Sequence, residues 1–363
     1  MPAARKDLFP PFPIGLKGRR GELTTLAARV RPRQGARIAL VGGGGSGKSV
    51  LACALGHRVK GRFRGGVHWF RSGPWDAATL AEMLSIRFGT ARARAERWSA
   101  LRTFFHAIGS TFIVFDNHEN DRAMSELLNH LQGAPVTWVL TARRCLLAGI
   151  QIFPVMAPQA TTGASAFARV RALTNLLRHS PLALDMADAV VQSGAETVDG
   201  LRSWLIGRGV DRICVIEHED DLPEARLLVD WAWARLGPSE RRMLAVLAHS
   251  RGDHVDGASL STLARVRSGA ESERALAQLR AWHIVQCPLS DRYTLHAVVR
   301  HALSKRTRFS QTRFLRHYLS LLERSPERLD LEQTHLYAAM DHAHAESNMG
   351  WILRIDRLLA KLA

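Results

Sequence analysis

The chain has 363 residues, of which 46% are hydrophobic. This length and apolar content allow more than one core, so two to four domains are expected. No apolar run reaches the roughly 18 residues of a membrane span, and the first residues lack the apolar stretch of a signal peptide, so we expect a soluble, cytoplasmic chain with no membrane partner. The four cysteines are far apart and indicate neither a disulfide framework nor a zinc site: Cys53, Cys145, Cys214 and Cys287.

The formal net charge of +17 is the unusual bulk property. A basic surface can hold nucleic acid or an acidic partner. An arginine-rich composition inherited from a GC-rich genome would give the same charge without any such partner, and composition alone slightly favours that explanation. The basic residues form short clusters: Arg29, Arg31, Arg33 and Arg37; Arg58, Lys60, Arg62 and Arg64; Arg92, Arg94 and Arg97.

The N-terminal segment, residues 1–35, begins with prolines and ends in a helix. Phe9–Pro13 is too rich in proline for a helix or a central strand. Gly18 and Arg19 then lead into a helix predicted over residues 23–30.

Gly42–Ser49 matches the pattern G-x-x-x-x-G-K-[ST] between a predicted strand, residues 37–41, and a predicted helix from Val50. This context predicts a phosphate-binding loop rather than a flexible turn. Glycines let backbone N–H groups converge on anionic oxygens, the lysine supplies a positive charge for the β- and γ-phosphates, and the serine supplies a hydroxyl for Mg²⁺. The expected nucleotide contacts are Gly42, Gly43, Gly44, Gly45, Ser46, Gly47, Lys48, Ser49 and Val50.

Residues 36–158 alternate between strand and helix, which predicts an α/β nucleotide-binding domain. Gly65–Phe70 is the second predicted strand, and residues 76–108 have helical spacing of apolar side chains. Thr111–Asp116 is an apolar run of the kind found in a central parallel strand. Asp116 ends this strand, where open α/β sheets bind ligands, and is expected to hold Mg²⁺ opposite Ser49.

A third buried strand, Val136–Leu140, is followed by Arg143. A guanidinium beside the phosphate loop can bind the γ-phosphate, because it matches phosphate geometry and is always charged. A surface arginine that closes a strand would look the same. Residues 149–157 predict the last strand of this domain.

Beyond residue 160 the pattern becomes mainly helical. We expect a helical domain over residues 159–221, with helices at 164–177, 182–191 and 198–205 and an acidic linker at 217–221. Residues 222–308 have four helical stretches, then two strand-like runs at 283–287 and 292–295 and a helix from 296, which describes a winged helix. Residues 309–363 predict two or three amphipathic helices.

The order of these motifs resembles the NB-ARC, or STAND, family of P-loop ATPases, in its bacterial branch. The resemblance spans roughly residues 15–305 and rests on several motifs: Gly18-Arg19, which in the family closes over adenine; Gly42–Ser49 as Walker A; Gly65–Trp69; Phe112–Asn117 as Walker B; Thr141-Ala142-Arg143 as the sensor; His179–Leu184, whose Pro181 would pack on the base; and Tyr293–Arg300, whose His296 would reach the ADP β-phosphate.

The resemblance implies ATP, ADP and Mg²⁺ as ligands, with Lys48, Asp116 and Arg143 as the catalytic residues. It also implies that residues 309–363 form the start of a helical-repeat sensor. A helical-repeat array needs about three repeats to be stable.

Three positions depart from the family pattern. Asn117 replaces the second Walker B acid and cannot act as a base, which puts the hydrolysis rate in doubt; Glu119 is a candidate substitute. His179 stands where the proline motif usually begins with glycine. Ala297 replaces the acid of the Met-His-Asp motif, which suggests a looser ADP-bound state.

Two functions follow. The preferred one is an ATP/ADP-dependent switch with slow hydrolysis in a bacterial signalling or defence system. The residues before Gly18 are too few for an effector domain, so its output is expected from self-association or a separate effector protein. The alternative is a nucleic-acid-binding ATPase or transcription regulator that uses the winged helix and the basic surface.

Overall fold

The computed structural model describes residues 9–12, 19–32, 35–90, 95–156, 167–210, 222–250 and 254–362. Gly18, Cys214 and the acidic run at 217–221 lie outside these ranges. The chain forms two compact units: residues 1–42, 47–155 and 356–363 in the first, and residues 43–46 and 156–355 in the second. Among the described residues, no helix combines the length and the apolar character that crossing a membrane requires.

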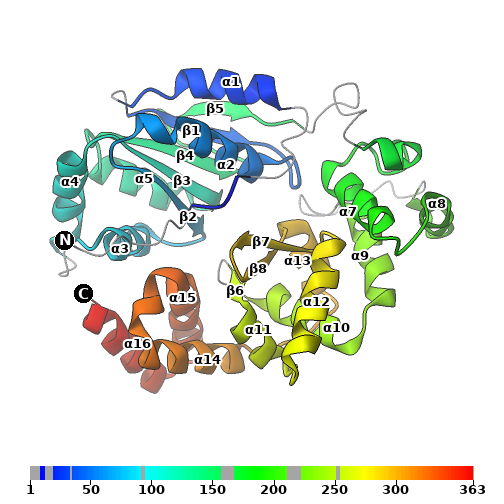
Figure 1. The fold of residues 1–363 in the computed structure, drawn as a ribbon. Coiled ribbons are helices and arrows are strands. Elements are labelled where there is room, and N and C mark those ends of the chain that lie inside the picture. The colour runs from blue at the N-terminus through cyan, green and yellow to red at the C-terminus, as the bar shows by residue number, and fades with distance from the viewer. Residues whose placement is uncertain are drawn as a thin grey trace. The chain divides into compact units, whose positions relative to one another are not determined.

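The first unit is built on a five-stranded parallel sheet (Figure 1). The strand order is β2-β3-β4-β1-β5, so β4 lies between the strand that precedes the phosphate loop and the strand that carries Asp116. Parallel strands place all their carboxyl ends at one edge of the sheet. The predicted α/β domain with a parallel sheet is confirmed, with these strands: β1 Arg37–Val41, β2 Val67–Gly73, β3 Thr111–His118, β4 Val136–Ala142 and β5 Gln151–Pro154.

Apolar side chains alternate between the two faces of the sheet, so each face has its own core. On one face, Phe112 and Val114 pack with Leu26 of α1 and Leu55 of α2. On the other, the Phe115 ring stacks on Trp138 at 5.9 Å, and Phe105 meets Trp138 edge-on. The helices of this unit are α1 Arg20–Arg29, α2 Lys48–Val59, the 3₁₀ turn η1 Lys60–Arg62, α3 Ala77–Phe88, α4 Arg97–Ile108 and α5 Asp121–His130.

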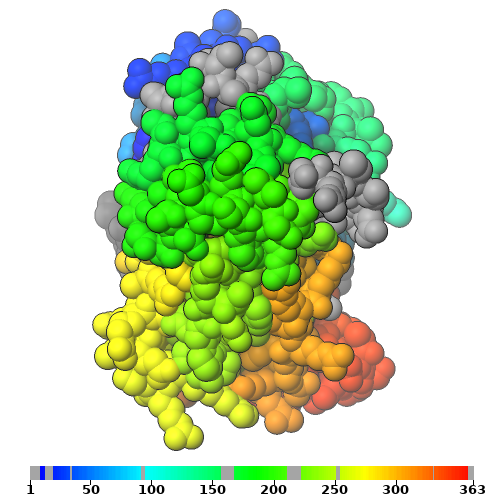
Figure 2. All heavy atoms as spheres, turned by 90° about the vertical axis from the view of Figure 1, so that its right-hand side faces the viewer, coloured from blue at the N-terminus to red at the C-terminus, as the bar shows by residue number. Residues whose placement is uncertain are grey.

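The second unit is mainly helical. Its helices of residues 167–210, green in Figure 2, present a rounded surface to the viewer. A three-stranded antiparallel sheet of order β6-β8-β7 lies in its middle part. The elements are η2 Ala168–Leu173, α7 Pro181–Gln192, α8 Val198–Gly207, α9 Pro223–Arg235, α10 Pro238–His249, β6 Val255–Asp256, α11 Gly257–Ala264, α12 Gly269–Ala281, β7 Val285–Leu289, β8 Arg292–Leu295, α13 Ala297–Ser304, α14 Gln311–Arg324, η4 Pro326–Arg328, α15 Leu329–Ala345 and α16 Met349–Leu362.

Two elements of this unit differ from the sequence-based expectation. The helix predicted over 164–177 is, within the described residues, a 3₁₀ turn at 168–173 with a kink at Val170. Val170 and Leu173 are both fully buried and three residues apart, a spacing that a 3₁₀ turn places on one face. Strand β6 was not predicted, because two residues are too few to show an alternating pattern; it pairs with Arg292 and Tyr293 of β8.

A buried ionic cluster joins this sheet to α15. Its members are Asp256, Arg292, Arg328 and Glu332, with His254 and His335 against them. Arg292 of β8 donates from both terminal nitrogens to the Glu332 carboxylate, at 2.8 and 2.6 Å, and Glu332 is fully buried. Arg328 bridges Glu332 and Asp256, each at 2.9 Å.

The titration of this cluster follows from its burial and its charges. Although burial opposes ionisation of Glu332, its bonds to Arg292 lower the carboxyl pKa to about 2. Burial lowers the His335 pKa from 6.5 to about 4, so the folded imidazole is neutral. The unfolded chain binds more protons at both positions than the folded chain does. The stability that these two groups contribute is therefore fully present above about pH 6.5. It decreases as the pH falls from 6.5 toward 4, because of His335, and decreases further below the usual glutamate pKa of 4.5, because of Glu332.

Replacing Glu332 by Gln is expected to lower the opening free energy of α15 by about 3–5 kcal/mol, because Arg292 is left as an unpaired buried charge. Hydrogen exchange of α15 at neutral pH measures this change, and wild-type protein at pH 5 should also show weaker protection. The matched control is Glu323→Gln, which breaks the exposed Arg354–Glu323 pair and should cost less than about 1 kcal/mol. Equal effects of the two variants would contradict a stabilising role for the cluster.

Candidate functional site

The phosphate loop leaves β1 at Gly42 and enters α2 at Lys48. Gly42 N–H donates to Ala142 O at 3.3 Å, which fixes the start of the loop to the end of β4. Gly45 and Gly47 have φ of 71° and 86°, in the left-handed region that favours glycine. Gly47 is the N-cap of α2 and has no side chain to accept the first N–H groups of the helix, so these can bind an anion.

Lys48 folds back over the loop. Its Nζ donates to Gly42 O at 2.9 Å, so the ammonium group lies across the space that the loop encloses. A phosphate with two or three anionic oxygens offers this ammonium group stronger, charge-assisted bonds than a single carbonyl does. The geometry therefore places a positive charge where the loop would hold phosphate.

Asp116, at the end of β3, is bonded to two hydroxyl groups. Its Oδ1 accepts from Ser49 Oγ at 2.7 Å and from Thr141 Oγ1 at 2.5 Å. The expected juxtaposition of Asp116 and Ser49 is thus present in the structure. Mg²⁺ prefers oxygen ligands and usually keeps several waters, with one or two protein oxygens plus phosphate. The carboxylate of Asp116 and the hydroxyl of Ser49 fit this donor set.

A β-bulge in β3 accounts for this geometry. Between the pairs Phe115–Leu140 and His118–Ala142, two residues of β3 face one residue of β4. Those two are Asp116 and Asn117, and Asn117 has a left-handed φ of 56°. The one facing residue is Thr141, whose Oγ1 also accepts from Asn117 N–H at 3.0 Å. Bulges beside active sites re-aim side chains.

Two acids follow the bulge. Asn117 Nδ2 donates to Glu119 Oε1 at 2.5 Å, so the amide orients the exposed carboxylate of Glu119. His118 is buried and its Nε2 lies 2.6 Å from Asp121 Oδ1, while Asp121 Oδ2 accepts from Leu146 N–H at 2.8 Å. This pair ties α5 to the segment after β4. Nothing in the sequence indicated it, because a histidine within an acidic stretch has many explanations.

Arg143 and Arg19 both lie in the first unit, together with Gly47, Lys48 and Ser49. Arg143 directly follows β4, so it leaves the sheet at the edge where Asp116 and the loop are found. Arg19, the N-cap of α1, is buried and donates from one nitrogen to both oxygens of Glu22, at 2.9 and 2.8 Å. A Cβ added at Gly47 would lie 3.4 Å from Arg19 Nε. The guanidinium therefore packs against the last glycine of the loop.

Cys53 of α2 lies behind the loop and stays a thiol. Burial, with the nearby charge of Asp116 adding to it, raises its pKa to about 12. The neutral thiol donates weakly to Pro10 O and Pro11 O, at 3.5 and 3.4 Å. Cys53, Cys145 and Cys287 are unpaired by disulfide among the described residues.

Three predicted residues are not part of this geometry. Gly18 lies outside the described residues. Pro181 is the first residue of α7, after the N-cap Ser180, and His296 is the N-cap of α13; both belong to the second unit. Their contacts with a nucleotide stay a prediction. Among the described residues, no group of three or more His, Cys, Asp or Glu side chains could hold a metal without a phosphate.

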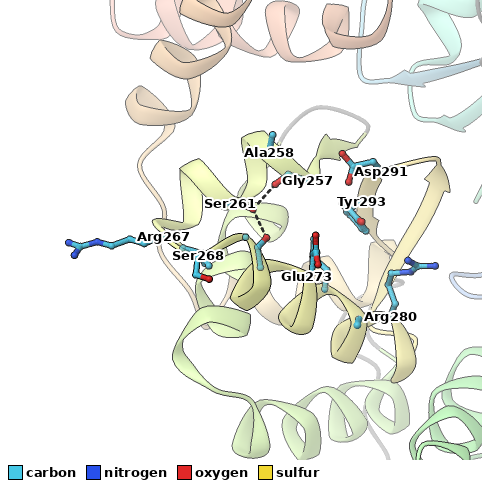
Figure 3. A pocket seen from close by; sticks show the side chains of 14 residues that line it. Gly257, Ala258, Ser261, Arg267, Ser268, Glu273, Arg280, Asp291 and Tyr293 are labelled. Carbon is cyan, nitrogen blue, oxygen red and sulfur yellow. Dashed lines mark hydrogen bonds between the residues drawn. The ribbon is translucent and has the colours of Figure 1, made fainter.

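The second unit has a hollow of its own (Figure 3). Its volume is about 550 Å³, and it lies among α11, α12 and the turn between β7 and β8. Ser261 and Ser272 are bonded to each other there at 2.5 Å, and Glu273, Arg280 and Asp291 line it without a single dominant charge. We assign it no ligand.

No protein-family model and no curated protein matches the chain. Among solved structures, a signal transduction ATPase with numerous domains (STAND) and a tetratricopeptide-repeat sensor, from Pyrococcus horikoshii, aligns with 99% of this chain at a TM-score of 0.58 and 14% identity. The first unit has the fold of a P-loop ATPase. The alignment covers 60% of the length of the Pyrococcus protein, and the low identity shows the fold alone.

Two further structures align less well. The Aeropyrum pernix ORC1 protein, solved in complex with DNA, has a TM-score of 0.39 at 15% identity over 81% of this chain and 94% of its own. The Thermotoga maritima RuvB branch-migration motor has a TM-score of 0.33 at 17% identity over 84% of this chain and all of its own.

Replacing Lys48 by Ala should weaken ATP and ADP binding at least about 100-fold, since charge-assisted hydrogen bonds contribute about 1.5–3 kcal/mol each. Titration calorimetry or a fluorescent ADP analogue measures the change. Lys305→Ala, an exposed lysine after α13, is the control and should bind as the wild type does. Unchanged affinity in Lys48→Ala would contradict the assignment of the loop.

Gly47→Ala should weaken ADP binding about tenfold. The alanine would have to adopt a φ near 86°, which is strained for a residue with a side chain, so the backbone of the loop would shift. Gly61→Ala is the matched control, because nothing lies within 4 Å of its added Cβ. The same titration checks both variants, and the idea fails if Gly61→Ala weakens binding as much as Gly47→Ala does.

Proposed function

We propose that this protein is an ATP/ADP-dependent switch of the STAND type, with Mg²⁺ as cofactor and slow hydrolysis. The observation that supports it is the pair of bonds from Ser49 and Thr141 to Asp116 beside the phosphate loop. These residues can bind a nucleotide phosphate and its metal ion. Asn117 follows Asp116 where a second acid would accelerate hydrolysis, so the site is better suited to holding a nucleotide than to rapid turnover.

In this proposal the loop binds the phosphates, Lys48 neutralises them, and Ser49 and Asp116 hold Mg²⁺. When bound, the metal would polarise the γ-phosphoryl oxygens. Arg143 would contact the γ-phosphate and thereby distinguish ATP from ADP. During hydrolysis, water attacks the γ-phosphorus, the bond to the β–γ bridging oxygen breaks, and Glu119, held by Asn117, is the candidate acceptor for the proton of the water.

His296 is the proposed contact of the second unit with ADP. Its Nδ1 accepts from Val298 N–H at 3.2 Å, which requires a lone pair on that nitrogen. In the neutral ring the proton then lies on Nε2, the donor that a β-phosphate oxygen needs. Exchange of ADP for ATP would favour a state without this contact, and a ligand shifts such an equilibrium only through its different affinity for the two states. Ala297, in place of an acid, fits a weakly held ADP state.

We assign residues 159–221 to a helical domain, 222–308 to a winged helix and 309–363 to the start of a helical-repeat sensor. Helices α10, α11 and α12 followed by the β7–β8 hairpin support the winged helix. For the alternative function, α12 would be the helix that enters a DNA groove. Its charges balance, with Glu271 and Glu273 against Arg274 and Arg280, so the helix is not the strongly basic surface that DNA binding uses, and we prefer an internal regulatory role.

The first test is to identify the nucleotide that is released when the purified protein is denatured. The second is to measure the mass of the protein in solution with ADP and with ATP, for the wild type and for Lys48→Ala. We expect ADP or ATP to be released, a larger assembly or a complex with a partner in ATP, and no ATP response in Lys48→Ala. Light scattering coupled to size-exclusion chromatography gives the mass. If the protein binds nucleotide but has the same mass with ADP, with ATP and in Lys48→Ala, the proposed switch is contradicted.

A further inference from the structure

The sequence from Leu23 to Trp75 contains ten arginines and lysines and no acidic residue. The interval opens after Glu22 and closes before Asp76. A uniformly arginine-rich composition would scatter acids among the bases, as the rest of this chain does. Composition alone therefore does not explain this acid-free stretch, and the position of its cations in the structure becomes informative.

Several of these cations gather at the amino-terminal edge of the parallel sheet. Helices α1 and α2 end just before the chain turns back into β1 and β2, and parallel strands all begin at the same edge. Arg62 donates to Ala27 O at 2.9 Å, which joins η1 to the end of α1. Arg64 N–H donates to Ser110 Oγ at 3.3 Å, directly before β3. We call Arg29, Arg31, Arg58, Lys60 and Arg64 the basic edge.

The side chains of the basic edge are exposed, and within the described residues no carboxylate pairs with any of them. In the second unit some exposed arginines, such as Arg202, Arg267 and Arg316, also have no carboxylate partner within the described residues, whereas others are ion-paired. There Arg169, Arg235 and Arg306 are bonded to Asp188, Glu196 and Asp230. Unpaired like charges close to one another repel and slightly destabilise the fold, so an anionic partner that supplies the counter-charge would stabilise this surface.

Helix capping explains only part of the basic edge. Cations near a helix C-terminus interact favourably with its dipole, and Arg62 does so through its bond to Ala27 O. Arg29 lies over the Phe153 ring at 5.4 Å, which is a packing role. Arg29 and Arg58 lie in the last turns of α1 and α2, and Lys60 is the C-cap of α2, so the helix dipoles account for part of their placement. Arg31 and Arg64 lie outside the helices, where this explanation does not apply.

We propose that the basic edge binds the phosphodiester backbone of nucleic acid. Arginine forks match phosphate oxygens geometrically, and four of the five residues are arginines. Membrane insertion is not favoured, because no large apolar side chain is exposed among residues 29–32, 35–37 or 58–66. The basic edge consists of helix ends and the turns that follow them, so we expect contacts with phosphates rather than with bases, and binding that is independent of base sequence and falls steeply with salt.

The test compares two triple variants with the same loss of charge. Arg31→Gln, Arg58→Gln and Arg64→Gln together remove most of the basic edge. Arg202→Gln, Arg267→Gln and Arg316→Gln together are the control, from exposed positions in the second unit. Fluorescence anisotropy with a labelled random-sequence duplex, at several NaCl concentrations, measures the affinity and its salt dependence.

We expect the wild type to bind duplex with a salt-dependent affinity. The basic-edge variant should bind at least tenfold more weakly, with the slope of log K against log[NaCl] reduced by about 3, while the control stays within about twofold of the wild type. ADP affinity should be unchanged in both variants, which shows that they are folded and separates this inference from the proposed switch.

Three outcomes would overturn the proposal: no binding of duplex by the wild type, an equal loss in both triple variants, or tighter binding of anionic phosphatidylserine vesicles or polyglutamate than of duplex. An equal loss would mean that net charge alone determines binding. A preference for vesicles or polyglutamate would assign the basic edge to a lipid surface or an acidic protein.

Discussion

One carboxylate oxygen, Oδ1 of Asp116, accepts hydrogen bonds from two hydroxyl groups carried by different strands or their extensions. Ser49 follows β1 through the phosphate loop, and Thr141 closes β4. Because β4 lies between β1 and β3, this single oxygen ties together the ends of three neighbouring strands. The position of the loop, of any metal ion and of Arg143 all depend on that junction.

The N-terminal segment also contacts the phosphate loop. Arg19 holds Glu22 on its own helix and packs against Gly47, so α1 helps to shape the loop from outside the sheet. The left-handed backbone at position 47 favours glycine, and the Arg19 side chain lies in van der Waals reach of it.

The elements that bury apolar side chains could be predicted from the sequence, because near-continuous runs such as Phe112–Phe115 and Val136–Leu140 have few alternatives to a central strand. The strand order could not, since it depends on pairings between distant segments. The bulge at Asp116 and Asn117 left no signal either, because an extra residue in a strand changes register without changing composition. Ser49 and Asp116 were predicted as partners; Thr141 was noted beside Arg143, but its bond to the carboxylate was not foreseen.

The cluster around Glu332 determines how the second unit can deform. A helix that slides by one turn moves about 5.4 Å, which is more than the reach of the two bonds between Arg292 and Glu332. Sliding would leave both ions buried and unpaired, whereas rotation of α15 together with β8 keeps them bonded. Since β8 leads directly to His296, these bonds connect α15 to the strand that ends at that histidine and oppose displacement of α15 along its axis.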